Sequence, residues 1–317
     1  MASAPGSTAS VIEHGSKSFA SAARLLPYEK RASVQRLYAW CRHCDDEIDG
    51  ETLGFGTAPF DRRYAGHRLD HLREATLDAL AGRAREAPFI ALQEVVAQHS
   101  IPARYPLDLI EGMAIDVEGR RFANINDTLE YSYHVAGSVG LMMAIILGAR
   151  ECGTLQRACD LGIAFQLTNI ARDTISDAQR GRTYLPEDWL REAGVAPTQV
   201  ADAAKRQAVF DVAARVLRTS DAYYDSALVG IRSLPVRSAW GIASALRIYR
   251  RIGEQLTARG CSAWDTRVET SKPTKLLLTG VAAVDVIRGH LQQRSFDRDG
   301  LWTPTALGGE PRLSPSD

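Results

Sequence analysis

Apolar residues recur three and four positions apart along almost the whole chain, and this spacing constrains the fold more than any other feature. The spacing matches one face of an α-helix, whereas a strand alternates at every second residue. The pattern predicts helices near residues 14–25, 30–49, 65–84, 88–98, 106–118, 127–148, 153–178, 186–192, 200–230, 235–259 and 273–293. They are separated by breaker segments at 50–60, 101–106, 181–186 and 233–235. We therefore expect an all-α protein.

The chain shows no long linker and no repeat of solenoid period. We expect one helical domain over residues 11–295, between loose tails at 1–10 and 296–317 that are rich in small residues or patternless. The start of the chain has no apolar core of the signal-peptide kind. The longest strongly apolar run, residues 139–149, is much shorter than the roughly 20 residues that span a bilayer. An integral membrane protein is therefore not expected.

Charge and cysteine content exclude other classes. The chain has 38 basic and 38 acidic residues, and this balance argues against nucleic acid as the main partner. Its five cysteines are odd in number and lie in predicted helices, which favours a reducing cytoplasm over a disulfide framework. Cys41 and Cys44 resemble half of a zinc site, but no second Cys-x-x-Cys exists and both fit helix packing.

The segment CRHCDDEIDG, residues 41–50, places two carboxylates on the inward side of a predicted helix. At about 100° per residue, Asp45 falls inside the edge of the apolar arc and Asp49 on its shoulder. Tyr38 and Arg42 lie in the same sector. Acids four residues apart are common on exposed helix faces, where their repulsion costs little. Facing a dry interior, they would need a compensating charge.

A second pair, Asp173 and Asp177, repeats the arrangement on the helix near 153–178. Gln166 and Asn169 share its narrow polar seam, which apolar residues flank. Two inward pairs would repel each other unless cations lay between them, and oxygen ligands suit Mg²⁺ or Mn²⁺. Bridging metals could hold a diphosphate, with Arg42 and Arg172 beside it. An apolar lining below would protect a carbocation from water.

Two further segments allow both a structural and a functional interpretation. The segment HGSKSF, residues 14–19, is either a capped helix start or a source of phosphate contacts from Ser16, Lys17 and Ser18. In residues 131–148, the small Gly137 and Gly140 could leave room for a chain-like ligand. A regular helix there would place Tyr131 on one face with Val135, Ser138 and Met142, so that its hydroxyl looks into an apolar channel.

The motifs taken together resemble a known family. SKSF at 16–19, YAWCRHCDDEID at 38–49, YSYHVAGSVG at 131–140 and FQLTNIARDTISDAQRGRTYLP at 165–186 are similar to motifs of the squalene/phytoene synthase family. The resemblance covers residues 10–293 and looks closest to the bacterial phytoene synthases of carotenoid pathways. It implies a single-domain class I isoprenoid synthase fold with a central apolar cavity.

The resemblance also implies a reaction. Two geranylgeranyl diphosphates would be joined head to head (1'-1), through the cyclopropyl intermediate prephytoene diphosphate, to give 15-cis-phytoene and diphosphate. This is the first committed step of carotenoid biosynthesis. It would need two or three Mg²⁺ or Mn²⁺ ions bridged by diphosphate, and no NADPH. A cytoplasmic protein is implied, with peripheral contact at the inner face of the cell membrane left open.

Family roles carry over onto matching positions. The two metal motifs fall on Asp45 with Asp49 and on Asp173 with Asp177, with Asn169 near the metals. Tyr131, Arg42, Asp45 and Asp173 match catalytic positions. The matching positions for diphosphate binding are Ser16, Lys17, Ser18, Tyr38, Arg42, Gln166, Arg172, Tyr249 and Arg267. One departure is Ser176, where many relatives have an acid, and we expect at most a modest change in metal affinity.

Three alternatives remain open at this point. The first is a dehydrosqualene or squalene synthase that acts on farnesyl diphosphate, since sequence alone does not locate the floor of the tunnel. The second is a terpene cyclase that ionises one diphosphate and closes rings. The third is a non-enzymatic assembly factor of the same family, although such proteins tend to lose the aspartates that are all present here.

Overall fold

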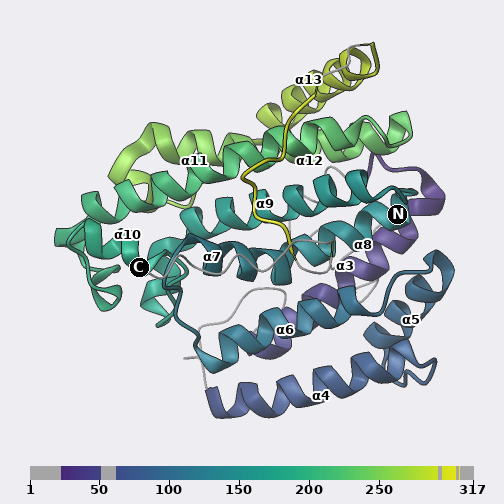
Figure 1. The fold of residues 1–317 in the computed structure, drawn as a ribbon, viewed down its shortest axis with the longest axis horizontal. Helices are drawn as coiled ribbons and strands as arrows, with labels where there is room; N and C mark the ends of the chain where they lie inside the picture. Colours follow the sequence, from purple (N-terminus) through teal and green to yellow (C-terminus); the bar gives the residue numbers. More distant parts are fainter. Residues whose placement is uncertain (1–22, 51–61, 292–294, 305–306, 308–317) are drawn as a thin grey trace.

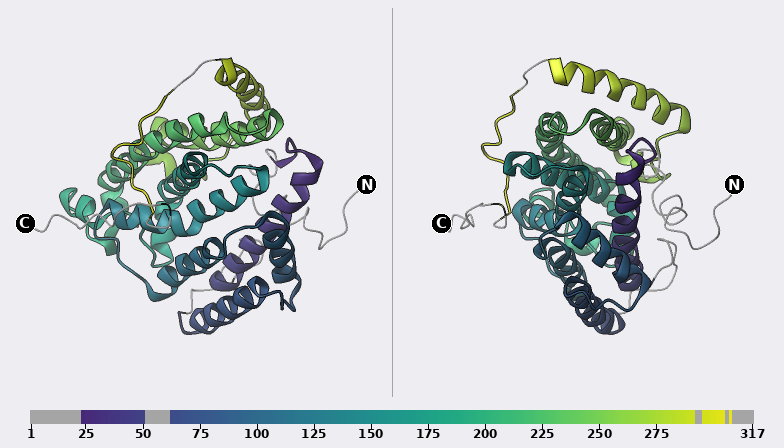
Figure 2. Two further views of the ribbon diagram at one scale, coloured as in Figure 1. Left: turned by 45° about the vertical axis from the view of Figure 1, so that its right-hand side comes forward. Right: turned by 90° about the vertical axis from the view of Figure 1, so that its right-hand side faces the viewer.

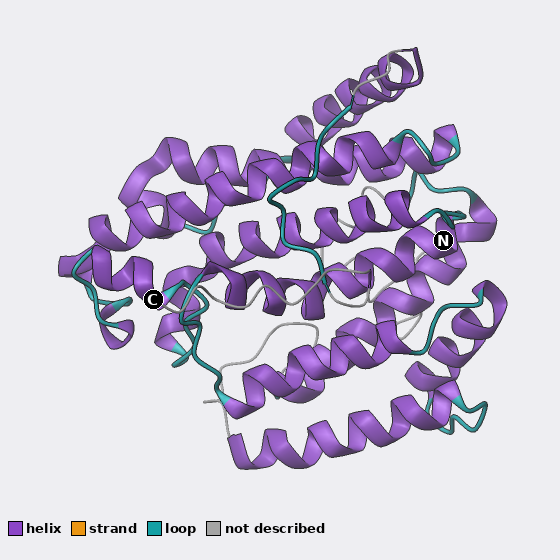
Figure 3. Ribbon diagram, in the orientation of Figure 1, coloured by secondary structure: helices purple, strands orange, loops and turns teal. Residues whose placement is uncertain are grey.

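A computed structural model describes residues 23–50, 62–291, 295–304 and 307. All regular structure within these ranges is helical, which confirms the all-α prediction (Figure 3). The main helices are α3 (Tyr28–Asp49), α4 (Arg62–Leu80), α5 (Ala87–His99), α6 (Arg104–Glu118), α7 (Ile125–Ser132), α8 (Ser138–Leu147), α9 (Cys152–Gln179), α10 (Glu187–Glu192), α11 (Arg206–Ile231), α12 (Val236–Arg259) and α13 (Lys272–Leu291).

Most predicted helices agree with these bounds to within a few residues. The helix predicted from residue 200 begins only at Arg206, after short 3₁₀ turns at Pro197–Gln199 and Ala203–Lys205. The Asp202 side chain accepts a hydrogen bond from the Ala204 N–H, 2.9 Å away, and so caps the second turn instead of continuing a helix. The helix predicted at 14–25 lies mostly outside the described residues.

Helix α9 runs through the middle of the bundle, where it packs against α8, α11 and α12 (Figure 1). Its inward residues Ile163 and Leu167 are completely buried. Helix α3 packs against α4, α5 and α8, so the two helices that carry the acid pairs belong to the same core. Removing this apolar surface from water, at about 25 cal/mol per Å², is the main stabilising contribution.

Glycines allow α9 to lie unusually close to residues 136–140, which span the end of a π turn and the start of α8. A Cβ atom on Gly162 would lie 2.3 Å from the Ala136 carbonyl oxygen, and one on Gly140 would lie 2.5 Å from that of Ala158. A Cβ on Gly137 would meet the Cys159 Sγ at 3.0 Å. These glycines mainly allow the close approach of α9, while Gly140 also lines the cavity described below.

A π turn over Tyr133–Gly137 interrupts the helix predicted at 127–148. The Ser138 N–H donates to the Tyr133 carbonyl, five residues back, so the turn holds one more residue than an α-helix. Everything after it is rotated by about 100° relative to a regular helix. The predicted face of Tyr131, Val135, Ser138 and Met142 is correct only as far as Val135.

Part of the predicted C-terminal tail is anchored to the helical core. Arg298 forms a bidentate ion pair with the fully buried Asp160 of α9, with both N···O distances 2.7 Å. The Arg157 guanidinium donates to the Phe296 carbonyl at 2.9 Å, and the Trp302 N–H donates to the Tyr223 hydroxyl at 3.1 Å. We call residues 295–304 the C-terminal strap. Its contacts come from single side chains, which explains why the sequence pattern did not predict that this segment is anchored.

None of the described helices combines the length and the apolar character needed to cross a bilayer. Helix α13 crosses over α12 at the outer edge of the molecule (Figure 2). The Trp240 Nε1–H of α12 donates to the Thr279 carbonyl of α13 at 2.8 Å, and Arg247 pairs with Asp285. These contacts fix which side of α13 faces the core.

Candidate active site

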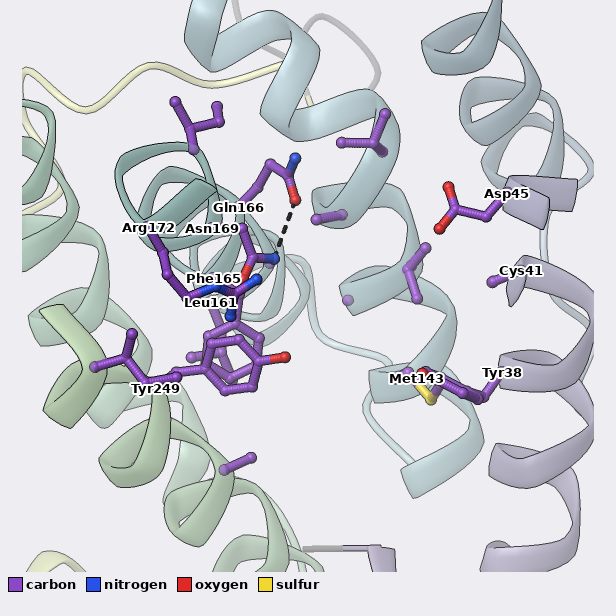
Figure 4. Close-up of a pocket in the computed structure, with 18 of the residues that line it drawn as sticks. Tyr38, Cys41, Asp45, Met143, Leu161, Phe165, Gln166, Asn169, Arg172 and Tyr249 are labelled. Carbon is purple, nitrogen blue, oxygen red and sulfur yellow. Dashed lines mark hydrogen bonds between the residues drawn. The ribbon is translucent and has the colours of Figure 1, made fainter. Parts of the chain in front are cut away.

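A cavity of about 690 Å³ lies between α3, α6, α8, α9, α11 and α12. Acidic and basic side chains from the C-terminal halves of α3 and α9 line its polar end. The other walls are mainly apolar, from Met113, Val139, Met143, Leu161, Phe165, Ile231, Leu234 and Ile242. In the close-up, Tyr38 and Asp45 face Asn169, Arg172 and Tyr249 across the opening (Figure 4). A charged end and a long apolar interior suit an amphiphilic ligand.

The structure brings the described members of the predicted site to this one cavity. They are Tyr38, Arg42, Asp45, Asp49, Tyr131, Gln166, Asn169, Arg172, Asp173, Asp177, Tyr249 and Arg267. Ser16, Lys17 and Ser18 lie outside the described residues. The placement tests proximity alone, and the individual roles of these residues stay predictions.

On α3, Arg42 holds the acids that follow it by one helical turn. Its guanidinium lies 3.2 Å from Asp45 and 2.7 Å from Asp46. The Asp45 side chain keeps 56% of its accessible surface, but that surface faces the cavity and protein surrounds it. This burial raises the pKa of Asp45 to about 7, against the opposing effect of Arg42, while Asp49 adds to the rise. A cation beside Asp45 would favour its ionised form.

On α9, the second pair is similarly crowded. The Arg172 Nε donates to Asp173 at 2.9 Å, and a second guanidinium N–H completes a bidentate pair. Asp177 lies one turn further on, where burial and the nearby Asp173 raise its pKa to about 8 and Arg182 opposes the rise. A divalent cation would relieve the repulsion between these two carboxylates.

Arg182 connects the end of α9 to α3. It follows the C-terminus of α9 by three residues, and its Nη1 lies 2.7 Å from the Asp49 carboxylate. Gly181, with φ of +80°, turns the chain back toward the cavity in a conformation that glycine adopts at little cost. Arg182 thus reaches back from the end of α9 to the acid pair of α3.

Asp116 and Tyr184 belong to the site although the motifs did not single them out. Asp116, on α6, accepts hydrogen bonds from the Tyr131 hydroxyl at 2.9 Å and from the Tyr184 hydroxyl at 2.7 Å. Burial raises the pKa of Asp116 to about 6, and Arg182 and both hydroxyls restrain the rise. The available signal was a single acid between Ile115 and Val117, both buried in the structure.

Tyr131 therefore does not present its hydroxyl to an apolar channel, as the sequence predicted. The hydroxyl is directed at Asp116, and its ring stacks on Tyr184 with centroids 4.8 Å apart. Tyr249 is fixed in a similar way, because its ring stacks on Phe165 at 4.2 Å. Stacking thus orients both tyrosine rings at the cavity wall, which suits positioning of a ligand.

The donor set fits hard divalent cations. The Asn169 Oδ1 is buried and has no hydrogen-bond partner, and it lies one turn before Asp173 among carboxylates that line the same cavity. Among the described residues, no three acidic, histidine or cysteine side chains gather closely enough to bind one ion by themselves. Mg²⁺ commonly takes one or two protein carboxylates and completes its shell with water and phosphate oxygens. The site matches that mode of binding.

Comparison with known proteins places the chain in a family. The model of the squalene/phytoene synthase family matches residues 12–274. A 15-cis-phytoene synthase of Paracoccus sp. is 49% identical over 92% of this chain and 95% of its own length. One from Enterobacter agglomerans is 46% identical over 92% of this chain and 99% of its own.

A solved structure agrees with this result. A dehydrosqualene synthase, determined in complex with a ligand, superposes with a TM-score of 0.79 at 28% identity, covering 89% of this chain and 95% of its own. The predicted isoprenoid synthase fold is thereby confirmed. With the family model matching most of its length and its relatives nearly half identical, the chain belongs to the squalene/phytoene synthase family.

Proposed function

We propose that this protein is a phytoene synthase, which condenses two geranylgeranyl diphosphates head to head, through prephytoene diphosphate, into 15-cis-phytoene and diphosphate. The relatives that match it over 92% of its length carry that name. The observation that supports the proposal most is the meeting of two aspartate pairs, from α3 and α9, at one cavity with apolar walls. The reaction needs no reductant.

Asp45, Asp49, Asn169, Asp173 and Asp177 would hold two or three Mg²⁺ or Mn²⁺ ions. These ions supply Lewis-acid stabilisation of the negative charge that develops on a departing diphosphate. The site fits them because its donors are oxygens, because the Asn169 Oδ1 has no other partner, and because the crowded carboxylates gain from added positive charge.

Arg42 and Arg172 would contact phosphate oxygens together with Tyr249 and Arg267. Arg42 and Arg172 each already pair with an acid at the cavity, so both are oriented before a ligand arrives. Tyr38 and Gln166 lie at the same opening and would complete the polar contacts. Ser16, Lys17 and Ser18 are proposed to close this set from the N-terminal side.

The apolar walls would hold the prenyl tails and exclude water from the allylic cation left by ionisation. Tyr131 would lie near the reacting carbons, positioned by its hydrogen bond to Asp116 and its stacking on Tyr184. By accepting this hydrogen bond, Asp116 would keep the Tyr131 hydroxyl oriented. We assign Asp116 and Tyr184 as positioning residues.

The direct test is product identification by mass after incubation with geranylgeranyl diphosphate and Mg²⁺. We expect a C40 hydrocarbon and released diphosphate, both abolished in Asp45→Ala and Asp173→Ala. Asp70→Ala, an exposed position on α4, is the control and should keep full activity. A cyclised C20 product would instead identify a terpene cyclase, and a folded wild-type protein without metal-dependent diphosphate release would favour a non-enzymatic role.

The second candidate is a dehydrosqualene or squalene synthase acting on farnesyl diphosphate. The similarity to the dehydrosqualene synthase structure is the observation in its favour. Parallel incubations with the C15 and C20 diphosphates separate the two candidates, because turnover with the C15 substrate alone would reject the phytoene assignment. We place either activity in the cytoplasm, with the protein in contact with the inner face of the cell membrane.

A further inference from the structure

Helix α13 presents an apolar face to solvent in addition to the one that it buries. Leu276 is 76% exposed, Leu277 67% and Ile287 60%, and Val281 and Val284 are also exposed. At about 100° per residue these side chains, with Gly280, occupy one continuous arc of the helix. Ala282 and Val286, which are buried, lie on the opposite side. We call the arc of Leu276, Leu277, Val281, Val284 and Ile287 the outer face of α13.

This face is unusual for the molecule. Ten large apolar side chains are exposed in the described part of the chain, and five of them belong to the outer face of α13. Single exposed apolar residues are ordinary on protein surfaces, whereas a contiguous group marks a contact with something else. The same helix buries its other side against α12. The exposed arc therefore does not contribute to the packing that holds α13 in the fold.

We propose that the outer face of α13 lies on the surface of an anionic lipid bilayer. The charges that flank this face suit an anionic surface, because Lys272 and Arg288 are exposed at its two ends. The only acid of α13, Asp285, is turned inward and neutralised by Arg247, at 2.8 Å. An apolar arc with cations at its borders is the arrangement by which helices lie in the interface of anionic membranes.

The shape of the surface favours a bilayer over a second protein. Helix α13 forms a ridge along the outer edge of the molecule (Figures 1 and 2). Five side chains on one helix are far fewer than the roughly 20–30 residues per side of a stable protein interface. A bilayer can deform around a ridge, whereas a protein partner would have to offer a matching groove.

The cavity reaches the same helix. Lys275 lines the cavity wall, together with Thr270 just before the helix, while the adjacent Leu276 points outward. A bilayer in contact with the outer face would therefore lie about one helix diameter, roughly 10 Å, from the cavity. This step rests on the proposed function, since only prenyl substrates and a hydrocarbon product make a nearby lipid phase useful.

The test is co-sedimentation of the full chain with vesicles of phosphatidylglycerol and phosphatidylethanolamine. Wild type should bind them, more weakly at high salt, and should bind phosphatidylcholine vesicles less. In Leu276→Ser/Ile287→Ser the partition coefficient should fall about tenfold or more. Leu77→Ser/Ile90→Ser, which changes the same residue types at exposed positions on α4 and α5, is the matched control and should bind like wild type.

Lys272→Glu/Arg288→Glu separates the charge contribution and should reduce binding to the anionic vesicles only. Circular dichroism of each variant verifies the fold. The proposal is overturned if wild type does not bind, if both serine variants bind equally, or if the α13 variant loses self-association while vesicle binding is unchanged. Diphosphate release in detergent is measured in parallel, so that loss of the proposed activity is distinguished from loss of docking.

Discussion

Arg182 and Asp49 join the two acid-bearing helices of the cavity through a 2.7 Å ion pair. The same guanidinium lowers the pKa of Asp116 and of Asp177 against the effect of their burial. One cation thus offsets the charge of three carboxylates that come from α3, α6 and α9. In the metal-free protein, this shared counter-charge lowers the energetic cost of placing three carboxylates at the polar end of the cavity.

Replacing Arg182 with Ala should destabilise the metal-free protein by about 2 kcal/mol at pH 8, because it leaves partly buried carboxylates uncompensated. Arg182→Lys should recover part of the loss, since it keeps the charge but not the forked geometry. Urea unfolding with and without Mg²⁺ and inorganic diphosphate measures both effects. Arg191→Ala, exposed on α10, is the control, and equal stability of the two alanine variants would contradict the shared counter-charge.

Asp177 predicts a pH dependence of stability. Its folded-state pKa of about 8 is higher than the roughly 4 of an unfolded aspartate, so the folded protein binds the proton more tightly. The resulting stability is fully present below about pH 4 and is lost as the pH rises toward 8, by at most about 1.4 kcal/mol per pH unit.

Without metal, wild type should therefore lose more stability between pH 6 and 8 than Asp177→Asn, which cannot ionise. Thermal unfolding of both proteins at the two pH values measures this difference. Adding Mg²⁺ with inorganic diphosphate should flatten the wild-type dependence, because bound cations favour the ionised carboxylate. Parallel pH profiles of the two metal-free proteins would show that the Asp177 carboxyl is not perturbed.

Gly162→Ala should destabilise the fold by about 2–3 kcal/mol, because the added Cβ would lie 2.3 Å from the Ala136 carbonyl oxygen and force α9 away from the π turn. Gly153→Ala is the matched control on the same helix, since a Cβ there meets nothing within 4 Å. That change should be neutral or stabilise by about 0.5 kcal/mol. Denaturant midpoints of both variants measure this difference. Similar values would refute the close approach of α9 to the π turn.

Arg298→Ala should cost about 3–5 kcal/mol, because it leaves the fully buried Asp160 carboxylate without its cation. Adding Asp160→Asn should recover part of this loss. Arg251→Ala removes an exposed pair with Glu254 and should change stability by less than about 1 kcal/mol. If Arg298→Ala unfolds like Arg251→Ala, the C-terminal strap does not stabilise the core.

The sequence was informative wherever a pattern repeats. The four aspartates of the two pairs could be identified because each lies four residues from a like residue on the inward side of a helix with a clear apolar period. Asp116 and Tyr184 escaped because each is a single residue without a repeated spacing. Arg298 escaped for a related reason, since one side chain anchors an otherwise patternless segment to Asp160.

The prediction was wrong about which residues of α8 face the cavity, for a different reason. The π turn is defined by the bond from the Ser138 N–H to the Tyr133 carbonyl and packs against α9, and neither feature follows from the spacing of apolar residues. Extrapolating a regular helix from Tyr131 predicted Ser138 and Met142 on the cavity side. The structure places Val139 and Met143 there, each displaced by one residue.

The single extra residue in Tyr133–Gly137 sets the register of the cavity wall. If this turn became a regular α-helix without losing a residue, α8 would rotate by about 100° while Tyr131 stayed in place. Ser138 would then replace Val139 beside the prenyl chain, and a hydroxyl would enter a surface that must stay unreactive. In this part of the molecule, the hydrogen-bond pattern of one turn governs the chemistry of the lining as strongly as the identity of the residues does.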